Sequence, residues 1–215
     1  MTGAPVVYIV DDDASFRPAI CRVLKASGYA VVDFDSAAAF LQSIHDAKPG
    51  CLLLDVQMPT IGGLELQQEL AKLSHHWPII FMTAHGDIPM SVRAIKAGAE
   101  DFLSKPIPRQ TLLAAIERAL LRLHEAQQNL GRLDALKTLV AKLTPRENEV
   151  FALMVRGKMN KQIAHSLDTS ERTIKYHRQM IMQKLEVGSF AEAVSVAERT
   201  GILAPRPLPD VESAS

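Results

Sequence analysis

The residue types best suited to chemistry in this sequence stand directly after short apolar segments. Three consecutive aspartates, DDD at 11–13, follow VVYIV, and Asp55 follows CLLL. Thr83 and Lys105 stand after two later apolar segments in the same way. Several carboxylate oxygens suit a hard cation such as Mg²⁺ (or Mn²⁺), and a lysine beside them can hold an oxygen of a phosphoryl group. If these residues meet, the sequence predicts a site for a divalent metal ion and phosphate.

The three consecutive aspartates also have a more ordinary interpretation. Aspartate is a favoured N-cap, and a helix is expected to begin just after residue 13. A cap does not explain why an acid, a hydroxyl and a lysine follow three separate strands in this order. We therefore keep the metal and phosphate site as the prediction and expect Asp13 to be the cap.

The elements that must bring these residues together alternate regularly along residues 6–105. Strands are expected at 6–10, 30–34, 51–54, 79–82 and 101–103, and helices at 15–27, 36–46, 63–73 and 88–98. Right-handed crossovers between such strands give a parallel sheet with helices on both faces. The prediction is a doubly wound α/β domain with a five-stranded parallel sheet in the order 2-1-3-4-5. That order places the ends of strands 1, 3, 4 and 5 side by side, where ligands bind in such sheets.

Beyond residue 108 the pattern becomes helical throughout. Leucine or isoleucine at 112, 113, 116, 120, 123, 130, 133 and 136 approaches heptad spacing, which favours a long linker helix. A final sheet-covering helix followed by a flexible tether is the alternative. Thr144, Pro145 and Glu147 then form a helix N-terminus signature, and three more helical patterns follow. We expect a first domain at 1–123, a linker helix at 124–143, an all-α four-helix domain at 144–200 and a disordered tail at 201–215.

Residues 160–185 have the pattern of a helix-turn-helix. Apolar anchors alternate with cations and amides along the second helix, and such a surface suits phosphates and base edges. A surface helix of an ordinary bundle is the alternative. The candidate DNA contacts are Lys161, Ser170, Thr173, Lys175, Tyr176, His177, Arg178, Gln179 and Lys184. Helical periodicity puts Lys175, Tyr176 and Gln179 together as candidates for contacting bases, with the others toward the phosphates.

Composition is compatible with two folded domains. The chain has 215 residues, 47% of them hydrophobic and 22% charged, with a net charge of zero. Residues 144–200 carry 9 Lys+Arg against 7 Asp+Glu, so the basic part contains the helix-turn-helix. Cys21 and Cys51 fall in segments expected to be buried and are expected to be free thiols. Apolar runs stop far short of the roughly 18 to 20 residues that cross a bilayer, so we expect a cytoplasmic protein without membrane partners.

The motifs around the acids resemble the receiver domain of bacterial two-component response regulators. YIVDDDASFR, LLLDVQMP, FMTAHGD and DFLSKP match its signatures, and the resemblance covers residues 5–123. It implies phosphorylation of Asp55 by a sensor histidine kinase. It also implies Mg²⁺ held by Asp11, Asp12, Asp55 and the backbone carbonyl of Gln57, with Thr83 and Phe102 as a conformational switch and Lys105 as the phosphate partner.

The segment from Leu143 to Val194 resembles the LuxR-type DNA-binding domain along its whole length. Joined to a receiver, it is similar to the NarL/FixJ class, and IPMSVRAIKAGAEDFLSKP is closest to the FixJ-like branch. The resemblance implies a transcription regulator that forms a homodimer on phosphorylation, binds double-stranded promoter DNA and works with RNA polymerase. Tyr176 and Met159 depart from the usual family residues, so the preferred DNA sequence does not carry over.

Two further expectations concern assembly and activity. The dimer face is expected on the fourth helix and fifth strand, because opposite charges on one self-complementary face suit a two-fold contact. Its candidates are Met90, Val92, Arg93, Lys96 and Asp101; the alternative is solvated charge beside a core aromatic. The acid cluster is also shared by Mg²⁺-dependent aspartate-based phosphatases and phosphotransferases. Those enzymes need a second acid two residues after the nucleophile, where this chain has Gln57, so we do not expect an enzyme.

Overall fold

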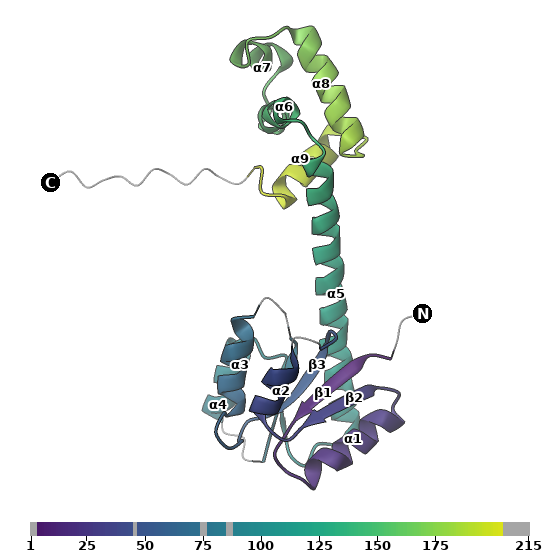
Figure 1. Cartoon of the computed structure of the whole chain (residues 1–215), viewed down its shortest axis with the longest axis vertical. Helices are drawn as coiled ribbons and strands as arrows, with labels where there is room; N and C mark the ends of the chain where they lie inside the picture. The colour runs from purple at the N-terminus through teal and green to yellow at the C-terminus, as the bar shows by residue number, and fades with distance from the viewer. Residues whose placement is uncertain (1–3, 45–46, 74–76, 85–87, 204–215) are drawn as a thin grey trace, which may run out of the picture. The chain divides into compact units, whose positions relative to one another are not determined.

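The computed structural model describes residues 4–44, 47–73, 77–84 and 88–203 (Figure 1). The chain divides into two compact units, Met1–Gln127 and Gln128–Ser215, and each is described by itself below. Within the described ranges, no helix combines the length and apolar character needed to cross a membrane. The predicted tail lies almost entirely outside the described residues, since these end at residue 203.

The first unit is built on the predicted parallel sheet. Its strands are β1 (Val6–Val10), β2 (Ala30–Phe34), β3 (Gly50–Asp55), β4 (Ile79–Thr83) and β5 (Asp101–Ser104), in the order β2-β1-β3-β4-β5. All neighbouring pairs are parallel, and the register pairs Val10 with Leu54 and Thr83 with Ser104. The sheet order and fold class expected from the sequence are therefore confirmed. The register brings the carboxyl ends of β1, β3, β4 and β5 to one edge.

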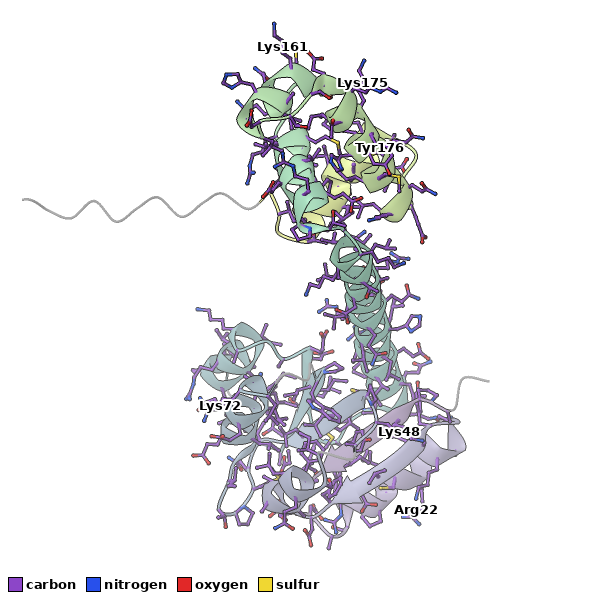
Figure 2. The ribbon with its side chains drawn as sticks, turned by 45° about the horizontal axis from the view of Figure 1, so that its top comes forward. Arg22, Lys48, Lys72, Lys161, Lys175 and Tyr176 are labelled. Atoms are coloured by element: carbon purple, nitrogen blue, oxygen red, sulfur yellow. The ribbon has the colours of Figure 1, made fainter. Side chains whose placement is uncertain are left out.

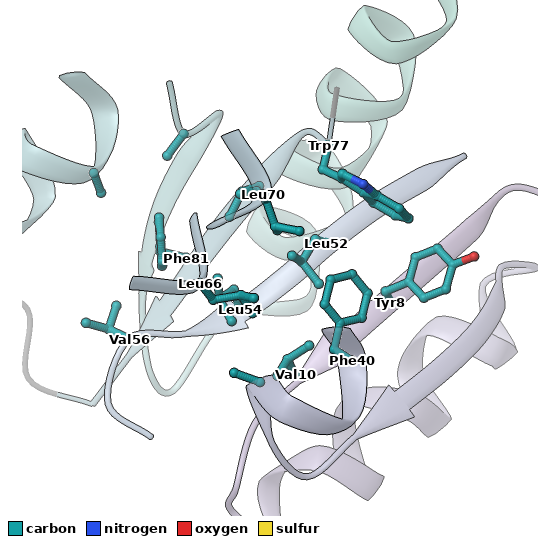
Figure 3. Packing of buried hydrophobic residues seen from close by; sticks show 14 of the residues in the cluster. Tyr8, Val10, Phe40, Leu52, Leu54, Val56, Leu66, Leu70, Trp77 and Phe81 are labelled. Carbon is teal, nitrogen blue, oxygen red and sulfur yellow. The ribbon is translucent and has the colours of Figure 1, made fainter. Parts of the chain in front are cut away.

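Helices cover both faces of this sheet. They are α1 (Phe16–Ala26), α2 (Ala37–Ser43), α3 (Gly63–Ala71), α4 (Ile88–Lys96) and α5 (Arg109–Ala141). Side chains of α2, α3 and α4 pack with Tyr8, Leu52 and Phe81 on one face, where Figure 3 shows Phe40 and Trp77 close to Tyr8. Side chains of α1 and α5 pack with Ile9 and Leu53 on the other face. Alternate residues of the inner strands thus enter opposite cores, as expected for a doubly covered sheet.

The helix ends differ from the sequence expectation by a few residues. Helix α3 stops at Ala71 rather than 73, and α4 stops at Lys96 rather than 98. Gly98 follows α4 with φ of 92°, a backbone conformation that glycine adopts without steric cost. The end expected for the second helix, residues 45–46, lies outside the described residues.

Helix α5 is one element of 33 residues rather than a short helix followed by a tether. Leu112, Ile116 and Leu123 are buried in the first unit, and Leu139 and Val140 pack on the core of the second. Between these stretches the helix is largely exposed, and Leu130 is 59% exposed. The heptad-like spacing therefore reports two different packing surfaces along the same helix.

The second unit contains α6 (Pro145–Val155), α7 (Asn160–Ser166), α8 (Glu171–Lys184) and α9 (Phe190–Arg199), the predicted helices of the all-α domain. Their apolar faces meet in one cluster that includes Phe151, Ile163, Ile174 and Ile181. The Thr144 hydroxyl accepts a hydrogen bond from the Glu147 N–H, and the Glu147 carboxylate accepts one from the Thr144 N–H. This reciprocal cap starts α6 at the predicted place.

The start of α3 sets a strict steric limit beside the end of β3. A Cβ added at Gly63 would lie 2.3 Å from the carbonyl oxygen of Asp55 and 3.1 Å from the Phe81 ring. At Gly62 the nearest atom to an added Cβ, the Val56 carbonyl oxygen, is 3.5 Å away. Glycine is therefore required at 63 and is not required for space at 62.

We expect Gly63→Ala to destabilise the first unit by about 1–3 kcal/mol or more, because overpacking against fixed backbone forces a shift. Gly62→Ser is the matched control, since serine is a good N-cap in the extended conformation found there (φ −75°, ψ 164°). Urea unfolding followed by the fluorescence of Trp77, the single tryptophan, measures both. Equal stability of the two variants would contradict the steric argument.

Candidate functional site

Three carboxylates converge at the edge of the sheet where β1 and β3 end. Asp11, Asp12 and Asp55 each place an oxygen within 4.8 Å of the others. Asp11 and Asp55 are buried and Asp12 is exposed. A mixed set of buried and open carboxylate oxygens fits a hard divalent cation that retains some of its water. The three aspartates of the predicted metal set are thus brought together, and the Gln57 carbonyl remains a prediction.

Lys105 provides the positive charge between these acids. Its Nζ lies 2.6 Å from Asp11 Oδ2 and 3.4 Å from Asp55 Oδ1, and its side chain is 12% exposed. Burial raises the pKa of Asp55; Lys105 opposes this, the neighbouring charge of Asp11 adds to it, and the pKa stays above its usual value. Ionisation of Asp55 is therefore unfavourable in this pocket. A metal cation bound beside the carboxylate would reduce that free-energy cost.

Asp13 lies outside the acid cluster and caps α1, as expected. Its Oδ1 accepts hydrogen bonds from the backbone N–H groups of Ser15 and Phe16, at 2.8 and 3.0 Å, and also from the Ser15 hydroxyl. The hydroxyl bond, followed by the two backbone bonds, lowers the pKa of Asp13 to about 2. Within the run DDD, Asp13 therefore caps the helix, and Asp11 and Asp12 are the candidate metal ligands.

Phe16 and Arg17, which were not predicted as site residues, are neighbours of this pocket. Arg17 donates from Nη1 to the backbone carbonyl of Asp11 at 2.6 Å and from Nε to Asp33 at 3.2 Å. Phe16 lies under the Lys105 ammonium, whose Nζ is 4.2 Å from the ring centroid. Their place in the first turn after the acids is a signal that would have pointed to them.

The candidate switch residues lie within β4 and β5, Thr83 as the last residue of β4 and Phe102 as the second residue of β5. Thr83 is completely buried at the end of β4, and its carbonyl accepts a hydrogen bond from the Lys105 N–H at 2.7 Å. Phe102 is half-buried, packs against the first core and lies 6.2 Å from the Phe81 ring, centroid to centroid. Gln57 is exposed, two residues after Asp55. The hydroxyl and the aromatic ring thus belong to neighbouring strands, and Thr83 is fully buried whereas Phe102 is half-buried.

Part of the predicted DNA-contacting set lies on the open surface of α7 and α8. Figure 2 shows Lys161, Lys175 and Tyr176 projecting from this unit, and Gln179 is also exposed. Tyr176 is 60% exposed, so its ring is open to solvent. Ser170 caps α8 by accepting a hydrogen bond from the Thr173 N–H at 3.1 Å, so its role in the structure is the start of the helix.

Three other predicted contacts, His177, Arg178 and Lys184, are less open to solvent, and two of them contact residues of other helices. His177 and Arg178 are only half-exposed, and the Arg178 guanidinium lies 5.9 Å from the centroid of the Phe190 ring. Lys184 donates to Glu147, a 5% exposed carboxylate, at 2.6 Å. His177 and Arg178, predicted as contacts to DNA phosphates, are thus only partly exposed, and Lys184 has a structural partner that the sequence did not reveal.

Further polar candidates, absent from the predicted set, lie on α7 and just before it. Lys158, Gln162 and His165 are exposed and line a shallow hollow together with Lys161 and Ser166. Within α7, Lys161 and His165 are four residues apart, as are Gln162 and Ser166, and this spacing is a signal for a shared polar face.

The expected dimer face contains both exposed apolar groups and paired charges. Val92 is 44% exposed, and Ile88 and Ile95, which the sequence analysis omitted, are exposed on the same helix. Asp101 pairs with Arg118 at 2.6 Å, and Glu100 pairs with Arg122 at 2.7 Å. Met90 packs on the first core. Among the predicted charges of this face, Asp101 thus has a partner within one chain, and Arg93 and Lys96 are exposed.

Comparison with known proteins identifies a protein family for each of the two units. Residues 7–117 match the response regulator receiver domain, and residues 141–197 match the luxR family of bacterial regulatory proteins. Response regulator protein TodT of Pseudomonas putida is 44% identical over 91% of this chain and 86% of its own length. Transcriptional regulatory protein FixJ of Bradyrhizobium diazoefficiens is 38% identical over 94% and 99%. The structure of response regulator StyR is 47% identical, with a TM-score of 0.80 over 91% of this chain and 99% of StyR.

A receiver joined to a LuxR-type domain defines a class of DNA-binding proteins that are controlled by phosphorylation. The chain belongs to the response regulators of two-component systems, in the NarL/FixJ class, and is a phosphorylation-activated transcriptional regulator. A sensor kinase and DNA are accordingly its partners.

We expect the second unit to lose stability as the pH falls. Burial acts to raise the pKa of Glu147, but hydrogen bonds from Lys184 and Thr144 outweigh it, and the pKa is lowered. A carboxyl whose folded pKa lies below its unfolded value, near 4.5, adds stability above that value and loses this contribution as the pH falls through the folded pKa. Hydrogen-exchange protection of the α6 and α8 amides in the full chain should therefore decrease below about pH 5.

Glu147→Gln should show weaker protection at pH 7 and a smaller change with pH. Glu149→Gln is the control, because its pair with Arg146 is exposed and such pairs contribute little. The same pH profile for the native chain and Glu147→Gln would show that this carboxylate does not stabilise the unit.

Proposed function

We propose that the acid pocket accepts a phosphoryl group on Asp55, with Mg²⁺ or Mn²⁺ held by Asp11, Asp12, Asp55 and the backbone carbonyl of Gln57. The observation that carries this proposal is the convergence of three carboxylates, two of which, Asp11 and Asp55, contact Lys105. When bound, the metal ion would neutralise charge on the transferring oxygens and align them for in-line displacement.

The side chains of the pocket then have separate tasks. An oxygen of Asp55 attacks phosphorus, and the bond from phosphorus to the histidine nitrogen of the sensor kinase breaks. Lys105 stabilises negative charge on a phosphoryl oxygen, since its ammonium already lies 3.4 Å from Asp55. Thr83 turns its hydroxyl toward the same group, and Phe102 moves into the space released, which changes the surface of α4 and β5.

The chain keeps the phosphoryl group instead of turning over outside substrates. The residue two positions beyond Asp55 is Gln57, which cannot serve as a general acid or base. An aspartate-based phosphatase would need such a group to activate water or a leaving group. The acid cluster is therefore a reversible signalling site, in a protein that acts in the cytoplasm.

Phosphorylation leads to a homodimer through the α4–β5 face, with Val92, Ile95 and Ile88 supplying apolar contact beside Arg93, Lys96 and Asp101. An isologous contact of this kind pairs one patch with itself. The dimer presents two helix-turn-helix units to promoter DNA and acts on RNA polymerase there. Lys175, Tyr176 and Gln179 contact bases, and Lys161 and Thr173 contact phosphates.

We expect Asp55→Asn to abolish labelling by radioactive acetyl phosphate in the presence of Mg²⁺, because the amide retains the shape of the side chain but is not a nucleophile. Light scattering should show that the native chain forms dimers when acetyl phosphate is added, whereas the oligomeric state of the variant does not change. Glu65→Gln is the control for both measurements, because Glu65 is an exposed residue of α3 outside the pocket. Full labelling of Asp55→Asn would place the phosphoacceptor elsewhere.

The two kinds of DNA contact are separable by measurement. Lys175→Ala should relax preference at one position of a selected binding sequence, at a cost of about 1–3 kcal/mol. Lys161→Ala should weaken binding to all sequences alike and lower the salt slope by about one. Binding-site selection and salt titrations of the full chain measure these effects. If neither substitution changes binding, the exposed surface of α7 and α8 is not the DNA interface.

A further inference from the structure

The ammonium of Lys105 has one neighbour that carries no charge. Its Nζ lies 4.2 Å from the centroid of the Phe16 ring, while it also contacts Asp11 at 2.6 Å and Asp55 at 3.4 Å. A cation over an aromatic face is attracted by the ring quadrupole, and the attraction grows when water is excluded. Lys105 is only 12% exposed, so this contact forms under the more favourable condition.

The position of Phe16 does not depend on the lysine. Phe16 is the first residue of α1, and its N–H donates to the Asp13 carboxylate at 3.0 Å. The next residue, Arg17, is tied to the Asp11 carbonyl, and the Phe16 side chain packs against the core that α1 shares with α5. The helix cap, Arg17 and the core therefore hold Phe16 in place through contacts that do not involve Lys105.

We propose that Phe16 is a positioning residue for phosphoryl transfer, because its ring holds the Lys105 ammonium beside Asp55. Asp11 is the nearest partner of Lys105 and also a candidate metal ligand, so the two cations compete for one carboxylate. When Asp11 turns to the metal, the flexible lysine stem loses its strongest restraint. The ring has no ligand atom for a metal and keeps the ammonium within reach of the phosphoryl oxygen. This inference rests on the proposed role of Asp55 as phosphoacceptor.

The first test compares an apolar replacement with aromatic ones in the full chain. At saturating Mg²⁺, Phe16→Leu should slow the initial rate of labelling by acetyl phosphate about 3- to 30-fold, the range of one such contact. Phe16→Tyr and Phe16→Trp should remain close to the native rate, because each keeps a ring face. Tyr29→Leu is the control, since it removes a half-buried ring from the same core. Thermal unfolding of each variant establishes that it is folded.

The second test asks whether the effect passes through the lysine. In a Lys105→Met background, Phe16→Leu should cause no further loss of labelling rate. In the metal-free native protein, NMR should show the ε-methylene protons of Lys105 shifted upfield by the ring, and Phe16→Leu should remove this shift while Phe16→Tyr keeps it.

Three outcomes would overturn the inference: an unchanged rate in Phe16→Leu, an equal loss in Phe16→Tyr, or an equal loss in the Lys105→Met background. Any of them gives Phe16 a purely structural role or none. If the native chain is not labelled at all, the proposed role of Asp55 as phosphoacceptor is wrong, independently of Phe16. The NMR shift then still decides whether the ring and the ammonium are in contact.

Discussion

Two carboxylates, Asp11 and Asp55, lie buried side by side at the carboxyl edge of the sheet, where their like charges repel and water is largely excluded. A cation among the acids offsets this repulsion, and the Lys105 ammonium occupies that position. Lys105 comes from the end of β5, so the cation reaches the acids only because β5 pairs with β4 and β4 with β3 in this register. The charge balance of the pocket is therefore a product of the whole sheet.

The same pocket is held from the α1 side by a second set of contacts. Asp13 caps α1, Arg17 donates a hydrogen bond to the Asp11 carbonyl, and the Phe16 ring contacts the Lys105 ammonium. On the α3 side, Gly63 lets the helix start against the backbone of Asp55. These contacts leave the acids little freedom to separate, so repulsion is retained in the folded state. A site that keeps unfavourable charge in this way is prepared to bind a cation, because binding relieves the repulsion without rearranging the fold.

Much of this arrangement was predictable, because it follows from local patterns. Apolar runs ending in polar residues identified the strands and the cluster, and Thr144 with Glu147 identified the start of α6. The contacts that escaped prediction join distant positions: Lys184 and Glu147 are 37 residues apart, and no periodicity links them. Periodicity located the outward face of α8 at Lys175 and Gln179, but the half-burial of Arg178 depends on Phe190 of another helix. Thr60 adopts a φ of 71°, and a threonine gives no sequence signal for that conformation.

The exposed middle of α5 has a consequence for how such chains arise in evolution. Among the described residues, the core clusters of the first unit have no member in common with the core of the second, and the turns around Leu130 contribute to neither. A recombination event in that stretch would join two complete cores without breaking either one. The middle of α5 is thus a natural junction for gene fusion, where a receiver can acquire a different output domain while its own folding remains intact.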